Sequence, residues 1–244
     1  MTNALIQVDH LTKKYGKVTA LNDVSFTISD GITGILGENG AGKSTAIKIL
    51  LGLLQPTSGS ATILGQNALA NLDVRSRIGY MPEHDCLPSQ VSAAEFLTHM
   101  AEASGLPPTM ARTRAADTLR HAGLFEERYR AIGGYSTGMK QRVKLCQALV
   151  HDPSVVFLDE PTAGLDPISS RVVKDKIAKE RGRNRTFVLT SHVMSELEEL
   201  ADDIAFLIEG RIRFAGSIHD LKKMTRQLSL ERAIAHVLET GEAA

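Results

Sequence analysis

Residues 37–45 carry the residue types and the spacing of a loop that binds polyphosphates, G-x-x-x-x-G-K-[ST]. Glycines in this segment let consecutive backbone N–H groups turn inward toward an anion. Lys43 would add a positive charge beside the β- and γ-phosphates, and the Ser44 hydroxyl can bind Mg²⁺. The segment therefore predicts nucleoside triphosphate binding, against the simpler alternative of a glycine-rich turn with a chance Lys-Ser pair. The predicted phosphate-binding residues are Gly37, Glu38, Asn39, Gly40, Ala41, Gly42, Lys43, Ser44 and Thr45.

Two acids, Asp159 and Glu160, directly follow the four apolar residues 155–158. Such a run is typical of a parallel strand covered on both faces, and ligands of parallel sheets gather at the carboxyl ends of the strands. One carboxylate can hold Mg²⁺, and its neighbour can orient or deprotonate an attacking water. Because burying two acids without a cation would cost several kcal/mol, a purely structural role is disfavoured.

Three further positions could contribute, but each has a simpler explanation. Ser136 precedes a predicted helix, where backbone amides and a hydroxyl could bind an anion or merely cap the helix. His192 follows a predicted strand at 186–190 and could be an ordinary satisfied polar group. Its place beside other strand ends with phosphate chemistry favours a functional role. Tyr15, on a predicted turn, would by itself be an exposed aromatic residue.

The elements that must position these residues follow from hydrophobic patterns. Residues 32–36 read as a short buried strand, and apolar residues recur at helical spacing over 43–53 until Pro56. A strand before and a helix after the glycine-rich segment are the context that a phosphate loop requires. The helix N-terminus would then face the phosphates, where its dipole favours negative charge.

The rest of the chain alternates strands and helices. We expect a capping box at Ser92 and Glu95 to begin a helix, with Cys146 in the core. We also expect Arg112, Arg114 and Arg120 to form a solvated face, and residues 180–185 to form an exposed loop. The expected strands are 5–8, 24–28, 61–64, 77–83, 204–208 and 211–214, and the expected helices are 109–121, 168–179 and an amphipathic tail from 218 with Leu230, Ile234, Val237 and Leu238 on its apolar side.

Composition excludes several classes of protein. The 244 residues carry 28 basic and 28 acidic side chains, so no polyanion-binding surface is indicated and a nucleic acid partner is disfavoured. Two cysteines are too few for a disulfide scaffold, which fits a reducing compartment. No signal segment and no run near the ~18 apolar residues of a membrane span is seen, so we expect a soluble polypeptide.

Together, the motifs and their order resemble the nucleotide-binding subunit of ATP-binding cassette (ABC) transporters over almost the whole length. The resemblance implies an α/β P-loop NTPase fold, with a mostly parallel sheet core, an antiparallel β subdomain and an inserted α-helical subdomain. It implies an ATPase domain at 1–218, with the helical insert at about 84–150, and a helical tail at 219–244. It further implies ATP and Mg²⁺ as ligands.

The same resemblance assigns roles to individual residues. Tyr15 would stack on adenine, and residues 37–45 would form the Walker A loop. Asp159 and Glu160 would be the Walker B metal ligand and the general base. The stretch around Ser136 and Gly138 resembles the signature motif, Asp166 lies in what looks like the D-loop, and His192 matches the histidine that senses the γ-phosphate.

Two positions depart from the family pattern. The signature Leu-Ser-Gly-Gly-Gln is replaced by Tyr135-Ser-Thr-Gly-Met, which keeps Ser136 and Gly138. Glu83 stands where many relatives have glutamine. An added carboxylate near a triphosphate repels it unless Mg²⁺ lies between, so we expect Glu83 beside Ser44 and Asp159 among the metal ligands. These variants resemble the branch of the family that serves exporters.

The resemblance implies an ATPase that works as a dimer and drives a separate polytopic permease, placing the chain in the cytoplasm on the inner face of the cell membrane. An alternative is a soluble cassette ATPase in a non-transport remodelling complex, although such relatives tend to carry coiled-coil inserts, tandem cassettes or basic segments. A P-loop GTPase is disfavoured because the chain has no Asn-Lys-x-Asp segment. A regulator without turnover is disfavoured by Glu160 and His192.

Overall fold

The structure is a computed structural model that describes residues 4–84, 86–183 and 185–240. Its chain divides into two compact units: the first comprises Met1–Arg75 and Thr186–Ala244, and the second comprises Ser76–Arg185. Some residues of the predicted segments lie outside the described residues. They are residues 1–3 of the ATPase domain, residue 85 of the helical insert, residue 184 of the loop and residues 241–244 of the tail.

The first unit contains a three-stranded antiparallel sheet in the order β2-β1-β4. Ile6 pairs with Ile28 on one side and with Ile63 on the other, and all three side chains are buried. The two long strands meet at a turn containing Gly16, so both extend beyond the predicted 5–8 and 24–28. The exposed polar residues near this turn hide the strand pattern in the sequence. The strands are β1 (Ile6–Tyr15), β2 (Val18–Ile28) and β4 (Ser58–Ile63).

The first unit also contains the strand that leads into the glycine-rich segment. This strand, β3 (Ile32–Leu36), runs parallel to β7 (Thr186–Ser191) on one side and to β8 (Asp203–Ile208) on the other. Every residue of β3 and β7 is buried, as is typical of parallel strands covered on both faces. β9 (Arg211–Ser217) pairs antiparallel with β8. The helices of this unit are α1 (Lys43–Leu50), α7 (Met194–Leu200), α8 (Ile218–Thr225) and α9 (Leu230–Thr240).

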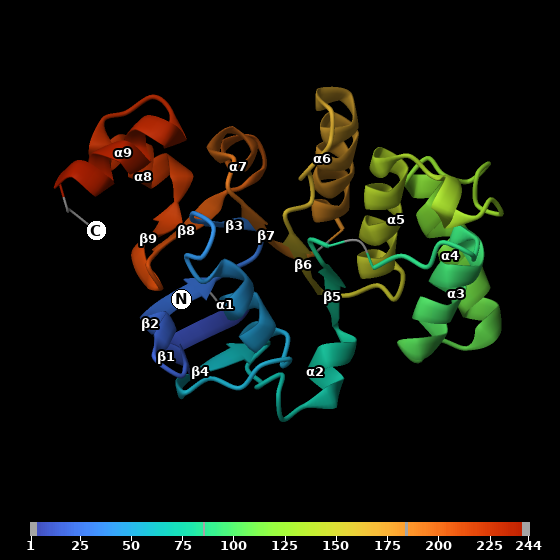
Figure 1. The fold of residues 1–244 in the computed structure, drawn as a ribbon, viewed down its shortest axis with the longest axis horizontal. Coiled ribbons are helices and arrows are strands. Elements are labelled where there is room, and N and C mark those ends of the chain that lie inside the picture. The colour runs from blue at the N-terminus through green and yellow to red at the C-terminus, as the bar shows by residue number, and fades with distance from the viewer. Residues whose placement is uncertain (1–3, 85, 184, 241–244) are drawn as a thin grey trace. The chain divides into compact units, whose positions relative to one another are not determined.

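In the second unit, α3, α4 and α5 lie side by side (Figure 1) around one apolar cluster that includes Leu97, Leu119 and Cys146. The predicted core position of Cys146 is therefore confirmed. Ser92 accepts a hydrogen bond from the Glu95 amide at 3.2 Å and caps the start of α3, as the capping box predicts. The elements are β5 (Ile78–Met81), α3 (Ala93–Ala103), α4 (Pro108–His121), the 3₁₀ turn Ile132–Gly134, α5 (Thr137–Leu149), β6 (Val155–Asp159) and α6 (Pro167–Arg181). The short helix α2 (Leu72–Ser76) lies mostly in the first unit, which ends at Arg75.

These elements confirm the predicted α/β class. Parallel strands form the central pairings, with β5 parallel to β6 and β3 parallel to β7 and β8. A separate antiparallel sheet and a group of helices between β5 and β6 in sequence complete it. Within the parts of the chain that the structure describes, no helix has both the length and the apolar character needed to cross a membrane.

The prediction of one amphipathic helix from residue 218 is wrong in detail, because the tail forms two helices. Arg226 adopts a left-handed backbone conformation, with φ of 54°, and ends α8. Of the four residues predicted on the apolar side of the tail, three are buried, but Leu238 is 52% exposed. The break between α8 and α9 sets the direction of α9 and hence the position of Leu238.

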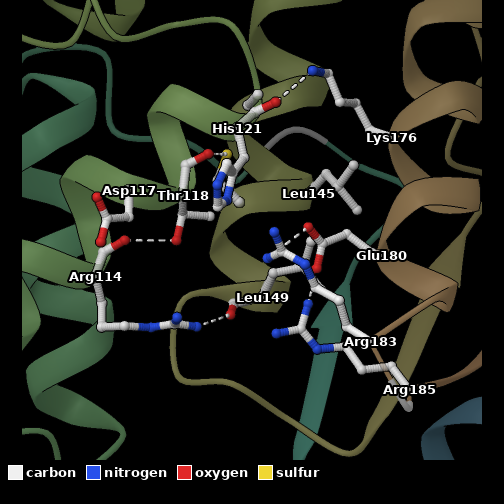
Figure 2. A pocket seen from close by; sticks show the side chains of 12 residues that line it. Arg114, Asp117, Thr118, His121, Leu145, Leu149, Lys176, Glu180, Arg183 and Arg185 are labelled. Atoms are coloured by element: carbon white, nitrogen blue, oxygen red, sulfur yellow. Dashed lines mark hydrogen bonds and ion pairs between the residues drawn. The ribbon is translucent and has the colours of Figure 1, made fainter.

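The prediction of an exposed loop at 180–185 is also wrong for the first and the last residue of this segment, which are both buried. Glu180 lies in the last turn of α6 and is 9% exposed, and Arg185 is 7% exposed. The Arg185 guanidinium pairs with the carboxylates of Glu180 and Asp152. Arg114, predicted to be solvated, donates to the Val150 carbonyl at 3.2 Å. It also donates to the Leu149 carbonyl at 3.5 Å at the end of α5 (Figure 2). Buried charges require such partners, and partners distant in sequence are invisible to a local pattern.

Replacing Glu180 with alanine should lower the free energy of unfolding by about 3 kcal/mol, because it leaves the buried Arg185 without its most buried partner. Replacing Arg183 with alanine is the matched control. Its side chain is 49% exposed and lies 3.4 Å from the same Glu180 carboxylate, so its loss should cost only about 0–1 kcal/mol. Urea denaturation of both variants measures the difference, and equal small losses would contradict a stabilising role for the buried pair.

Candidate functional site

The glycine-rich segment connects β3 to α1 and begins the helix without a side-chain cap. Gly42 occupies the cap position with φ of 108° and ψ of 1°, a conformation that side chains with a Cβ rarely adopt. A Cβ at Gly42 would also lie 2.5 Å from the Ala20 carbonyl oxygen of β2. The backbone path of the loop thus depends on glycine, and the loop leads directly into the start of α1, where the helix dipole favours an anion.

Lys43 is 7% exposed, and its side chain folds back over the loop. Its ammonium donates hydrogen bonds to the carbonyls of Gly37 at 2.7 Å and Glu38 at 3.2 Å. Ser44 and Thr45 follow in the first turn of α1 and are partly buried. The loop therefore gathers a cation, a hydroxyl and the start of a helix in one place, the combination that binds phosphate.

A pocket of about 450 Å³ in the first unit brings His192 together with the glycine-rich segment. The reason lies in strand register, because Leu36 pairs with Ser191, and the chain reaches His192 one residue later. This volume falls within the range of small-molecule sites. The other residues that line the pocket are Leu36, Gly37, Glu38, Asn39, Gly40, Ala41, Met194, Phe206, Leu207, Ile208, Glu209 and Leu238.

Tyr15 is the last residue of β1, where it pairs with Val18, and is 48% exposed. The Lys13 ammonium lies 5.1 Å from the centre of its ring. Tyr15 is not among the described residues that line the pocket with His192. Its exposed ring remains a surface on which a flat base could stack.

The two predicted acids lie in the second unit, at the end of β6. Every residue of β6 is buried, and Asp159 and Glu160 are only 5% and 7% exposed. Glu160 has a positive φ of 49°, and its carbonyl accepts a hydrogen bond from the Ala163 amide at 3.1 Å. For a residue with a side chain this conformation costs about 1–2 kcal/mol. It turns the chain sharply at the residue predicted to be the base.

Tyr80, which sequence reasoning missed, contacts one of these acids. It pairs with Phe157 in the parallel register of β5 and β6, so it faces the same side of the sheet as Asp159. Its hydroxyl donates a hydrogen bond to the Asp159 carboxylate. Burial, together with the charge of Asp159, raises the pKa of Tyr80 to about 12. The signal in the sequence is a tyrosine within a predicted strand. If that strand is paired in this register with the strand that ends in Asp159, the tyrosine lies opposite a residue two positions before the acid.

The remaining predicted residues of the second unit also have structural roles. Ser136 caps α5 by accepting a hydrogen bond from the Met139 amide at 3.3 Å, and Asp166 caps α6 through Ile168 and Ser169, both at 3.0 Å. Hydrogen bonds from Ser169 lower the pKa of the Asp166 carboxyl.

Gly138 and Glu83 complete the predicted set in this unit. A Cβ at Gly138 would lie 2.8 Å from the Ser169 hydroxyl, so α5 and α6 approach closely there. The Glu83 side chain is exposed, and its carbonyl accepts from the buried Lys144 ammonium at 2.7 Å.

The donor atoms suit Mg²⁺, which prefers oxygen ligands and in nucleotide sites takes most of them from phosphates and water. Two of the residues predicted as metal ligands have such atoms, a carboxylate at Asp159 in the second unit and a hydroxyl at Ser44 in the first. Across residues 4–84, 86–183 and 185–240, no three His, Cys, Asp or Glu side chains cluster as a metal site. A carboxylate and a hydroxyl fit a Mg²⁺ ion that arrives with a bound triphosphate.

Comparison with known proteins agrees with this geometry. The family described as ABC transporter matches residues 21–163. The bacitracin transport ATP-binding protein BcrA of Bacillus licheniformis is 36% identical over 230 residues, which span 92% of this chain and 74% of that protein. The Nod factor export ATP-binding protein I of Burkholderia orbicola is 35% identical over 223 residues, covering 91% of this chain and 73% of that protein.

A solved structure described as the ATP-binding subunit of an ABC transporter has a similar fold, with a TM-score of 0.84 and 29% identity. The match covers 96% of this chain and 99% of that one. Both the sequence and the architecture are therefore shared with proteins of one family. The chain belongs to the ABC transporter family, as one of its domains that bind and hydrolyse ATP.

Proposed function

We propose that the chain is a separate ATPase subunit that binds Mg²⁺-ATP, works as a dimer and powers a membrane permease, in the direction of export. The observation that carries this proposal is the pocket that unites the glycine-rich loop with His192. The names of two relatives, one a bacitracin transport protein and the other a Nod factor export protein, support a transport role. The second name favours export.

In this proposal the chain's own residues perform hydrolysis without a covalent intermediate. The loop amides and Lys43 hold the β- and γ-phosphates, and Tyr15 stacks on adenine. Glu160 accepts a proton from the water that attacks the γ-phosphate, and His192 contacts that phosphate. Asp159, Ser44 and Glu83 would hold the Mg²⁺, whose charge would offset the negative charge of the phosphates.

Dimerisation follows from the same assignments. One phosphate loop and one signature segment per chain call for a second copy, whose Ser136 and Gly138 would close over the ATP of the first, with Asp166 at the seam. We assign residues 1–218 to the ATPase domain, 84–150 to the inserted helices that contact the permease, and 219–244 to the tail. The permease partner would place the chain on the cytoplasmic face of the cell membrane.

Purification of the tagged full chain from detergent-solubilised membranes tests the transport role. We expect a polytopic membrane protein to copurify, and to remain bound after a wash in high salt, because a stable subunit interface is largely apolar. A strain that makes the untagged chain is the control for non-specific capture. Recovery of the chain only with soluble proteins would contradict the permease partner and favour a remodelling ATPase.

A further inference from the structure

We propose that the two tail helices form a clamp that holds His192 in position beside the phosphate loop. The clamp consists of α8 and α9, which contact α7, and of Leu238, which forms part of the pocket wall. This inference rests on the proposed role of His192 at the γ-phosphate. It assigns a positioning role in ATP hydrolysis to a tail that contains none of the sequence motifs.

His192 lies in a short connection between β7 and α7. The Ser191 hydroxyl accepts a hydrogen bond from the Val193 amide at 3.0 Å and donates one to the Glu196 carboxylate at 3.3 Å. The residues on either side of His192 are thus tied to one another and to α7. A displacement of α7 would therefore displace His192.

The helix α7 is short, so its position depends on tertiary contacts. It has seven residues, of which Leu197 is the buried one, and helices this short are unstable without tertiary contacts. Leu197 lies close to β3, because a Cβ at Gly34 would approach its side chain to 2.8 Å. This contact and the hydrogen bond between Ser191 and Glu196 join α7 to the sheet, and the tail helices cover another side of it.

The tail supplies that cover, and α8 and α9 lie beside α7 in Figure 1. The Glu198 carboxylate of α7 is the shared contact. One of its oxygens pairs with the Lys222 ammonium of α8, and the other accepts a hydrogen bond from the Leu230 amide of α9 at 3.2 Å. Both side chains of the ion pair are less than one third exposed, 27% for Lys222 and 29% for Glu198.

From its contact with Glu198 at Leu230, α9 extends to the pocket beside the glycine-rich loop. Leu230, Ile234 and Val237 are at most 4% exposed and fix the helix in the first unit. Two turns after Leu230, Leu238 lines the same pocket as His192 and the residues of the glycine-rich loop. Met194, the first residue of α7, lines it too. The tail therefore contacts α7 at Glu198 and reaches the pocket at Leu238.

The test is a charge reversal combined with removal of His192 in the purified full chain. Lys222→Glu places two like charges together and should lower kcat for ATP about tenfold or more, since displaced catalytic groups lose up to about a hundredfold. The dissociation constant for ATP should change less than about twofold, because the other phosphate contacts remain. The Lys222→Glu, Glu198→Lys double variant should restore turnover only in part, because it restores the ion pair but not the hydrogen bond from the Leu230 amide. Lys223→Glu, a reversal at the exposed neighbour, is the control.

A double-mutant cycle with His192→Ala separates positioning from simple stabilisation. If the tail acts through His192, Lys222→Glu should cause no further loss of kcat in the His192→Ala background. Equal losses in both backgrounds would overturn the proposal. So would wild-type kcat for Lys222→Glu while His192→Ala is impaired. If His192→Ala itself has wild-type kcat, the proposed role of His192 fails instead.

Leu238→Ser provides a second variant that should fold normally, because this side chain is 52% exposed. Its matched control is Leu228→Ser, at the 90% exposed leucine between the two tail helices. We expect a fall in kcat for Leu238→Ser alone, and again no additional fall when His192 is alanine. Wild-type kcat for Leu238→Ser would contradict the part of the proposal in which Leu238 helps to position His192.

Discussion

Replacing Glu160 with glutamine should leave ATP binding nearly intact and reduce ATP turnover by about 10²–10⁴-fold, the usual loss when a general base is removed. The substitution keeps the size and polarity of a side chain that is 7% exposed, so the fold should persist. A glutamine amide cannot accept the proton of the attacking water. Single-turnover hydrolysis and equilibrium binding of ATP, measured on the same preparation, separate the two effects.

The control for this result is Glu126→Gln, the same chemical change at an exposed residue of the second unit. It should leave both binding and turnover within about twofold of wild type, as expected for surface substitutions. Full activity of Glu160→Gln would reassign the base to another residue. A parallel loss of ATP binding would instead indicate that Glu160 holds the nucleotide or its metal.

The same variant should accumulate the proposed dimer, since bound ATP is no longer consumed. Light scattering with Mg²⁺-ATP should then report twice the mass of the single chain. Adding Ser136→Asp should abolish this dimer while preserving the start of α5, because aspartate is an equally good helix cap but repels phosphate. A dimer that survives Ser136→Asp would contradict the signature contact.

The sequence alone was sufficient to predict those parts of the fold whose motifs are continuous in the chain. The glycine-rich loop, its flanking β3 and α1, and the buried strands β6 and β7 were all predicted within a few residues. The position of His192 also followed from sequence, because parallel strands place their carboxyl ends at one edge of a sheet. Contiguous motifs encode their own backbone geometry, so they can be read without knowledge of the fold.

Contacts between distant residues could not be read this way. Tyr80 meets Asp159 only because β5 and β6 pair in one particular register. Arg185 is buried because Glu180 and Asp152 neutralise it, and the local run of charges resembled an exposed loop. Leu238 reaches the pocket only because the tail breaks at Arg226. Each case depends on pairing or packing that no single segment specifies.

Replacing Lys43 with methionine should abolish measurable turnover and weaken ATP binding by about 30- to 4,000-fold, the equivalent of about 2–5 kcal/mol for a buried charge that loses its partner. Methionine retains the apolar stem of a side chain that is 7% exposed, so no large cavity is created. The lost groups are the ammonium and its hydrogen bonds to Gly37 and Glu38.

Thermal unfolding with and without ATP distinguishes lost binding from lost folding. A ligand at a hundred times its dissociation constant stabilises the native state by about 2.7 kcal/mol, and this gain should vanish in Lys43→Met. Without ATP the variant should still fold, because removal of a buried charge offsets part of the loss of its hydrogen bonds to Gly37 and Glu38. Lys48→Met, at an exposed lysine in the last turn of the same helix, should keep the full response to ATP. Wild-type stabilisation of Lys43→Met by ATP would mean that the glycine-rich loop does not hold the phosphates through this ammonium.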